Sequence, residues 1–218
     1  MKHEKNKMNF WPSSKAVIHR LLHIKPIPLR QGINGPFIFI HINKTAGTSI
    51  GRAIGLPIKE HLTAVEVIAR IGMDKWKEAY KFTLVRNPWD KVVSHYEYRR
   101  KKNKTEIASR NISFSDWVNM TYGESKDTFY YNNPRSFQPQ VAWLKDTEGK
   151  ISMDFIGKFE SINKDFNHIR NVIGLDATLP HLNASNRASY QSYYDDETRG
   201  IVANWFREDI EEFGYNFN

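Results

Sequence analysis

The sequence predicts an α/β fold in which a central parallel sheet is flanked by helices, giving three layers. Short apolar runs at residues 37–40 and 82–85 are typical of parallel strands buried on both faces, and residues 154–159 are a third strand candidate. Segments with helical spacing of apolar residues separate these runs, and strands that alternate with helices build parallel sheets. The length of 218 residues fits one domain, expected at residues 36–218 behind a basic arm at residues 1–35.

Each element has a local signal of its own. The strand at 37–40 is followed by a polar turn at 43–48 and a short helix that ends at Gly55. Asn87 and Pro88 are a typical N-cap and first-turn proline, and they predict a helix that runs to Lys102. The remaining helices are expected at residues 63–71, 74–80, 114–120, 137–144, 162–173 and 195–213, with a long loop at 180–194.

The composition excludes several classes of protein. Without a cysteine the chain has no disulfide, zinc ribbon or thiol nucleophile, which fits a reducing compartment. No apolar run approaches the ~18 residues of a transmembrane helix, so we expect a cytoplasmic protein, with peripheral attachment to a membrane left open. The net charge of +8 indicates a negatively charged partner, and the basic residues concentrate at 1–30 and 81–104.

Residues 41–50 carry the clearest functional signal. The segment His-Ile-Asn-Lys-Thr-Ala-Gly-Thr-Ser-Ile places a small-residue turn between a strand and a helix start. Backbone N–H groups converge at such a turn, and the helix dipole favours an anion there. Lys44 adds a positive charge, and the hydroxyls of Thr45, Thr48 and Ser49 add donors. The pattern predicts a phosphate-binding loop and a phosphate-loop-like fold.

This loop differs from the kinase-type P-loop, in which the lysine follows the second glycine of G-x-x-x-x-G-K-[ST]. Here Lys44 precedes Gly47, and the strand at 82–85 ends in Arg86 rather than in an acid that would hold Mg²⁺. Phosphoryl transfer uses a metal to neutralise its charge, whereas a sulfuryl group carries less charge. The missing metal ligand therefore favours a function other than that of a kinase.

A second signal is the segment that begins with Arg86-Asn-Pro-Trp and reaches Ser94. Ligands of doubly wound sheets bind at the carboxyl ends of strands, which is where Arg86 stands. Its planar guanidinium can hold a phosphate through two hydrogen bonds, and Ser94 follows two helical turns later. A structural ion pair is the alternative reading of Arg86.

Together these motifs resemble those of sulfotransferases. The Lys-Thr-x-Gly-Thr-Ser turn is similar to their 5′-phosphosulfate loop, and Phe-Thr-Leu-Val-Arg-Asn-Pro-Trp with Ser94 is similar to their 3′-phosphate motif. The resemblance extends from Phe37 to Phe217. The motifs are most similar to those of the branch that includes heparan sulfate 2-O-sulfotransferase and small bacterial relatives. Asn43 and Ala46 stand where proline and glycine are common in that family.

The resemblance implies a donor, 3′-phosphoadenosine 5′-phosphosulfate (PAPS), whose sulfuryl group passes to an acceptor hydroxyl, with a carbohydrate the expected acceptor. Lys44 would neutralise charge on the leaving phosphate of the product, adenosine 3′,5′-bisphosphate (PAP). The 5′-phosphate would lie against Lys44, Thr45, Ala46, Gly47, Thr48 and Ser49, and the 3′-phosphate against Arg86 and Ser94. Ser185 and Arg187 lie on a loop that would close over the nucleotide. No metal and no nucleic acid is expected to bind.

Transfer to a hydroxyl needs a base, and histidine suits this role near neutral pH. His61 stands just before the helix at 63–71, where relatives carry a Lys-His-x-x-Ala-like segment with the catalytic base, so the resemblance favours His61. His41 and His95 stay open as alternatives. His181 and Glu160 are reserve candidates for contacts with the acceptor or the nucleotide.

Two other functions stay open at this point. A nucleotide kinase would bind ATP with Mg²⁺ rather than the 3′,5′-bisphosphate. A non-enzymatic nucleic-acid-binding protein would show an affinity that falls steeply with salt. The second alternative leaves the ordered loop around Lys44 unexplained, and the sequence has no compact nucleic-acid recognition motif.

Overall fold

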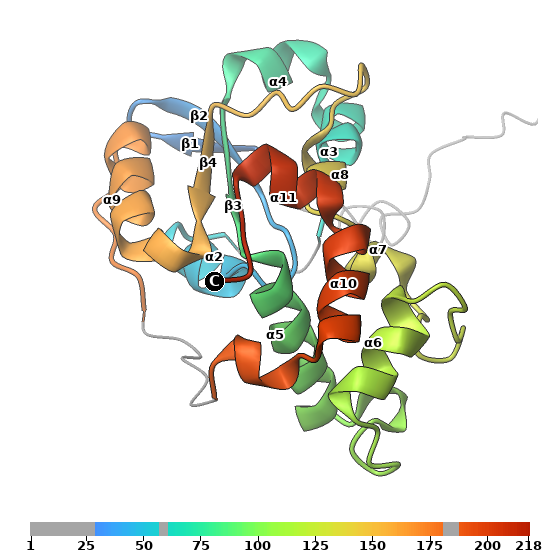
Figure 1. Ribbon diagram of the computed structural model, residues 1–218. Coiled ribbons are helices and arrows are strands. Elements are labelled where there is room, and N and C mark those ends of the chain that lie inside the picture. Colours follow the sequence, from blue (N-terminus) through green and yellow to red (C-terminus); the bar gives the residue numbers. More distant parts are fainter. Residues whose placement is uncertain (1–28, 57–60, 181–187) are drawn as a thin grey trace, which may run out of the picture.

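The computed structural model describes residues 29–56, 61–180 and 188–218, and its centre is a four-stranded sheet (Figure 1). The strands follow the order β1-β2-β3-β4 across the sheet. β2, β3 and β4 run parallel to one another, and β1 is antiparallel to β2. The bounds are Leu29–Gly32 for β1, Gly35–Ile40 for β2, Tyr80–Val85 for β3 and Phe155–Lys158 for β4. The three strands expected from the sequence are confirmed.

Strand β1 is a strand that the sequence did not predict, since residues 29–35 were assigned to the arm. It pairs with β2 through a tight turn, with Arg30 opposite Phe37 and Gly32 opposite Gly35. Gly32 is required there, because a Cβ would lie 2.3 Å from the carbonyl oxygen of Ile173. A four-residue edge strand with proline and glycine at its turn has no clear alternation, which explains the omission. Residues 1–28 of the expected arm lie outside the described residues.

Helices cover both faces of the sheet, so the three-layer α/β architecture is confirmed (Figure 1). Phe37 and Phe39 of β2 pack with α2 (Gly47–Ala53) and α9 (Ile162–Ile173). Ile38 and Ile40, which point to the other face, pack with α3, α4, α8 and α11. The bounds of these helices are Ala64–Ile71, Met73–Glu78, Val141–Leu144 and Arg207–Phe213.

A second group of helices packs beyond the end of the sheet around an aromatic core. It consists of α5 (Pro88–Lys101), α6 (Phe114–Tyr122), α7 (Pro134–Phe137) and α10 (Asp196–Trp205). Trp117, Phe137 and Phe206 are fully buried in this core. Helix α5 begins as expected, because Asn87 caps it by accepting from the N–H of Trp89 and Pro88 occupies its first position. Short 3₁₀ helices lie at Lys104–Glu106 (η1), Phe159–Ser161 (η2) and Tyr190–Tyr193 (η3).

Two of the expected helices differ in the structure. Of the helix expected at 137–144, only residues 141–144 are helical, as α8. The preceding helix α7 ends at Phe137, because Gln138 precedes Pro139 and adopts an extended conformation. The helix expected at 195–213 becomes α10 and α11, which meet at Phe206 with non-helical backbone angles. In the part of the chain that is described, no helix is both long and apolar enough to span a membrane.

Replacement of Phe206 by alanine is expected to lower the free energy of unfolding by about 3–5 kcal/mol, because the buried ring leaves a cavity among α5, α6 and α10. Urea denaturation measures the change. Phe129, which is 44% exposed, is the matched control, and its alanine variant should change stability by less than about 1 kcal/mol. Equal losses in the two variants would contradict this packing.

Candidate active site

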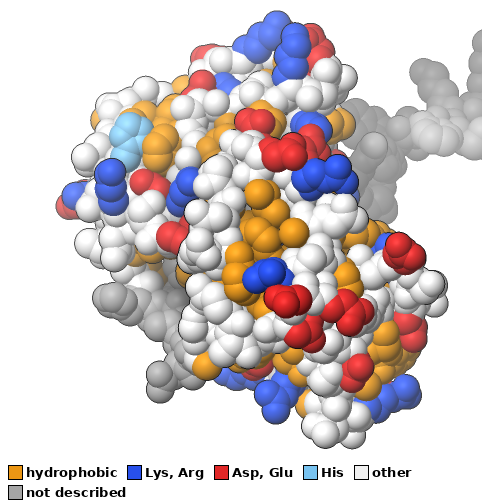
Figure 2. Space-filling model, viewed as in Figure 1, with side chains coloured by type: hydrophobic (Ala, Val, Ile, Leu, Met, Phe, Trp, Pro, Cys, Tyr) orange, Lys and Arg blue, Asp and Glu red, His pale blue; other side chains and the backbone are white. Residues whose placement is uncertain are grey.

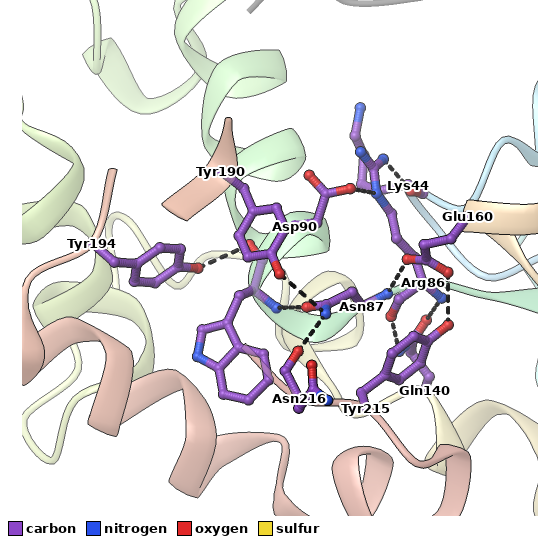
Figure 3. Close-up of polar contacts among 11 residues, drawn as sticks. Lys44, Arg86, Asn87, Asp90, Gln140, Glu160, Tyr190, Tyr194, Tyr215 and Asn216 are labelled. Carbon is purple, nitrogen blue, oxygen red and sulfur yellow. Dashed lines mark hydrogen bonds and ion pairs between the residues drawn. The ribbon is translucent and has the colours of Figure 1, made fainter. Parts of the chain in front are cut away.

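The three parallel strands end at one edge of the sheet, and the residues that follow them form the site. His41 to Ala46 follow β2, Arg86 follows β3, and Phe159 with Glu160 follows β4. Parallel strands present their carboxyl ends together, so the topology brings these three segments side by side. Figure 3 shows Lys44, Arg86 and Glu160 meeting at this edge.

The loop between β2 and α2 has an unusual backbone. Lys44 and Ala46 have φ values of 67° and 62°, in the left-handed region that favours glycine. Gly47, which starts α2, cannot carry a side chain, because a Cβ would lie 1.8 Å from the imidazole ring of His41. The first turn of α2 contains no acidic residue. Its polar N-terminal end is therefore compatible with a bound anion.

The hydroxyl groups of the loop differ in their surroundings. Thr45 is fully buried, and its Oγ1 donates to the carbonyl of Ile42 at 2.9 Å. Ser49 is buried as well, whereas Thr48 is exposed. Thr45 therefore uses its hydroxyl to shape the loop, which leaves the side chain of Thr48 and the backbone as the accessible donors.

Arg86 is buried and joins the loop to β3 and α5. Its Nε donates to Asp90 at 2.8 Å, and one terminal nitrogen donates to the carbonyl of Lys44 at 3.0 Å (Figure 3). The guanidinium also stacks on Phe159, 3.9 Å from the ring centre. The ion pair that the sequence left open for Arg86 is thus present. The guanidinium bonds the backbone of the very loop that was expected to bind the 5′-phosphate.

Helix α5 presents one face to this loop. Asp90, Ser94 and Tyr98 are spaced by four residues and share a face of the helix. Asp90 pairs with Arg86, and the Tyr98 ring contacts the ammonium of Lys44 at 4.4 Å from the ring centre. Ser94 lies between these two contacts. The structure joins Arg86 to the backbone of Lys44, and Ser94 lies on the same face of α5 as Asp90 and Tyr98.

Gln140 holds the main chain of Arg86 and was not found from the sequence. Its Oε1 accepts from the Arg86 N–H at 2.9 Å, and its Nε2 donates to the Arg86 carbonyl at 2.8 Å. Asp209, also fully buried, accepts from the N–H groups of Gln140 and Val141. Burial lowers the pKa of nearby Lys91 to about 8 and raises the pKa of Asp209. No local sequence pattern predicts these buried contacts of Gln140 and Asp209.

Glu160 ties the end of β4 to the start of α5. Its Oε1 accepts from the N–H of Asn87 at 2.7 Å, and its Oε2 accepts from the hydroxyl of Tyr215 at 3.0 Å (Figure 3). The Asn87 side chain in turn donates to the carbonyl of Asn216 at 2.7 Å. These bonds give Glu160 a part in joining the C-terminal segment to the site.

His61 lies beside the loop, with a defined tautomer. Its Nδ1 is 3.0 Å from the carbonyl oxygen of His41, and because a carbonyl can only accept, Nδ1 carries the proton. In the neutral ring the Nε2 atom therefore keeps its lone pair, as a general base requires. The rings of His61 and His41 are 4.2 Å apart. Arg135 donates to the His61 carbonyl and pairs with Glu66, which fixes the segment before α3.

The two other histidine candidates are in different surroundings. His41 is buried, and burial together with the charge of His61 lowers its pKa to about 3. His95 is buried between Trp117 and Phe137, with ring centres 5.6 and 4.9 Å away. Burial, followed by the positive charge of Lys91 and Arg99, sets the pKa of His95 well below its ordinary value. Of the three, His61 is the ring that is not enclosed.

Three residues singled out from the sequence, His181, Ser185 and Arg187, lie outside the described residues. The described residues contain no cluster of three or more His, Cys, Asp or Glu side chains that could hold a metal ion.

Comparison with known proteins identifies the family. Residues 34–216 match the model of the sulfotransferase family, so the chain belongs to this family. Its chemistry is accordingly the transfer of a sulfuryl group. An uncharacterized protein of Archaeoglobus fulgidus is 30% identical over 113 residues, which is 50% of this chain and 80% of that protein. A crystal structure of a sulfotransferase from Alicyclobacillus acidocaldarius covers 91% of this chain and 88% of its own, with 13% identity and a TM-score of 0.41.

The His41 ring is expected to stay neutral in the folded protein down to about pH 3. The unfolded chain takes up this proton near pH 6.5, so the unfolded state binds more protons between the two values. The stability that neutral His41 contributes is present above pH 6.5 and is lost as the pH falls towards 3. The full loss is on the order of 5 kcal/mol.

Imidazole NMR signals followed against pH, with urea unfolding at each pH, measure both effects. A His41→Phe variant should lose less stability than the wild type on acidification. A His41 signal that titrates near pH 6 in the folded protein would contradict the buried position of this ring.

Proposed function

We propose that the protein transfers the sulfuryl group of PAPS to a hydroxyl of a carbohydrate acceptor, without a metal ion and with His61 as the base. The bond between sulfur and the oxygen of the 5′-phosphate breaks, and PAP leaves with the electron pair. A new bond forms between sulfur and the acceptor oxygen, whose proton passes to Nε2 of His61. Membership of the sulfotransferase family sets the kinase alternative aside.

The hydrogen bond from His61 Nδ1 to the His41 carbonyl is the observation that carries this proposal. It holds the imidazole in the tautomer that accepts a proton at Nε2. The His41 ring in turn packs against Gly47, the first residue of α2. The base and the start of the loop are therefore linked through one intervening ring, which supports a position of His61 close to the transferring group.

The donor would be held at the edge of the sheet by the residues that the resemblance singled out. Lys44 would neutralise the leaving phosphate, and residues 45–49 would bind the 5′-phosphate through backbone N–H groups and the Thr48 hydroxyl. Ser94, which lies on the face of α5 between Asp90 and Tyr98, would bind the 3′-phosphate. Arg86 would support it there and, through the Lys44 carbonyl, keep the loop in place.

The carbohydrate acceptor and the cytoplasmic location belong to the same proposal. A hydroxyl acceptor is what a histidine base can activate near neutral pH. The absence of cysteine from the sequence fits a reducing compartment.

The His61→Ala variant is expected to lose about 10²- to 10⁴-fold in the rate of transfer, because the imidazole that takes the acceptor proton is removed. Its affinity for PAP should stay unchanged, since the ring does not hold the nucleotide. PAP release from PAPS with a panel of p-nitrophenyl glycosides measures the rate, and calorimetry measures binding. His168, exposed on α9, is the matched control for loss of a histidine. Equal turnover of His61→Ala and wild type would rule out this base.

The Arg86→Lys variant separates contact with the 3′-phosphate from support of the loop. We expect the affinity for PAP to fall about tenfold or more, because the guanidinium bonds to the 3′-phosphate are lost, and the affinity for adenosine 5′-monophosphate to fall by a smaller factor, because the loop loses its bond from Arg86. Calorimetry with both nucleotides gives the ratio, and Arg100→Lys, exposed on the same helix, is the control. An equal loss for the two nucleotides would show that Arg86 only supports the fold.

A further inference from the structure

Tyr98 stands out on α5 because an aromatic ring is exposed next to the loop. It is 40% exposed, one helical turn beyond Ser94. Two ammonium groups lie on its ring, that of Lys44 at 4.4 Å and that of Lys104 at 5.1 Å from the ring centre. The two distances add to 9.5 Å, so the two nitrogens lie within that distance of each other.

The segment that carries Lys104 is held in a strained conformation. Asn103, Thr105 and Glu106 have φ values of 44°, 52° and 57°, which residues with side chains rarely adopt. The buried side chain of Arg99 donates to Thr105 Oγ1 at 3.2 Å, and the Asn103 side chain accepts from the N–H groups of residues 108 and 109. Strain that is retained by such bonds is typical of functional positions.

These contacts indicate that the Tyr98 ring binds the lysine ammonium groups rather than filling space in the core. A ring buried in the core gains stability from its apolar contacts, whereas Tyr98 leaves much of its surface to solvent. A lysine ammonium within about 6 Å of an aromatic ring is attracted by the negative face of the ring. Lys44 has a flexible four-carbon side chain, and this attraction restricts where its ammonium lies.

We propose that Tyr98 is a positioning residue for Lys44: its ring holds the ammonium at the mouth of the site, in reach of the phosphate that leaves during transfer. The proposal rests on the proposed function, in which Lys44 stabilises that phosphate. Tyr98 acts through Lys44 and needs no contact of its own with the reacting atoms. Its effect therefore falls on the rate of transfer rather than on the affinity for the nucleotide.

Substitution of Tyr98 by phenylalanines carrying none, one, two and three ring fluorines tests this role, because fluorine withdraws charge from the ring while the shape is kept. Tyr98→Phe should retain nearly the wild-type kcat. Each fluorine should lower kcat further, and Tyr98→Leu should lose about fivefold. The affinity for PAP, measured by calorimetry, should not follow the series. The release of PAP from PAPS measures kcat in two reactions. The acceptor is a p-nitrophenyl glycoside in the first and water in the second.

The control is Phe129→Leu, since Phe129 is also exposed and has a cation, Arg110, 5.3 Å from its ring centre. This variant should keep the wild-type kcat. A flat fluorine series in an active enzyme, or equal losses in Tyr98→Phe and Tyr98→Leu, would overturn the role of Tyr98 and leave the proposed function standing.

The NMR signal of the Lys44 ε-methylene group gives a readout that is independent of activity. It should be shifted upfield by the Tyr98 ring in the wild type and return to its ordinary position in Tyr98→Leu. An unshifted signal in the wild type would overturn the contact itself. A shifted signal in a protein that neither binds PAP nor consumes PAPS would instead overturn the proposed function.

Discussion

The buried guanidinium of Arg86 is the interaction on which the site depends. It bonds Asp90 on α5 and the carbonyl of Lys44 in the loop after β2, and it stacks on Phe159 after β4. The side chain of Gln140 bonds both the N–H and the carbonyl of Arg86 and so fixes the main chain of that residue. A buried cation of this kind is stable only while its partners stay in place. The contacts of Arg86 therefore fix the ends of β2, β3 and β4 relative to α5. The same contacts fix the position of the Lys44 backbone.

The net charge of +8 suggests a surface that binds a negatively charged partner, but several of the basic residues are buried. Of the basic residues between 81 and 104, Lys81, Arg86, Lys91 and Arg99 are buried, each less than a tenth exposed. A buried cation serves internal pairing and is not available to an extended polyanion. On the surface that Figure 2 presents, basic and acidic side chains lie interspersed. The charge that would bind the nucleotide of the proposed function is therefore local, at Lys44 and its neighbours.

Most of the fold was predictable, because buried parallel strands and amphipathic helices have a regular spacing of apolar residues. The loop at Lys44 and the motif at Arg86 were predictable as well, since each follows a strand end. Gln140, Asp209 and Tyr98 were not, because their roles come from contacts between distant segments. The ion pair of Arg86 with Asp90 could have been predicted, because Asp90 stands four residues after Arg86, in the first turn of the expected helix. The division at Phe206 depends on its burial in the tertiary core, which no local pattern shows.

The hydrogen bond from His61 Nδ1 places the proposed base at the same edge of the sheet, since the carbonyl of His41 stands at the end of β2. A crystal structure of the protein with PAP is the most direct test. We expect the 5′-phosphate against residues 45–49, the 3′-phosphate beside Ser94, and His61 Nδ1 still bonded to the His41 carbonyl. A nucleotide bound away from this edge, or a His61 ring whose Nδ1 has left that carbonyl, would contradict this expectation.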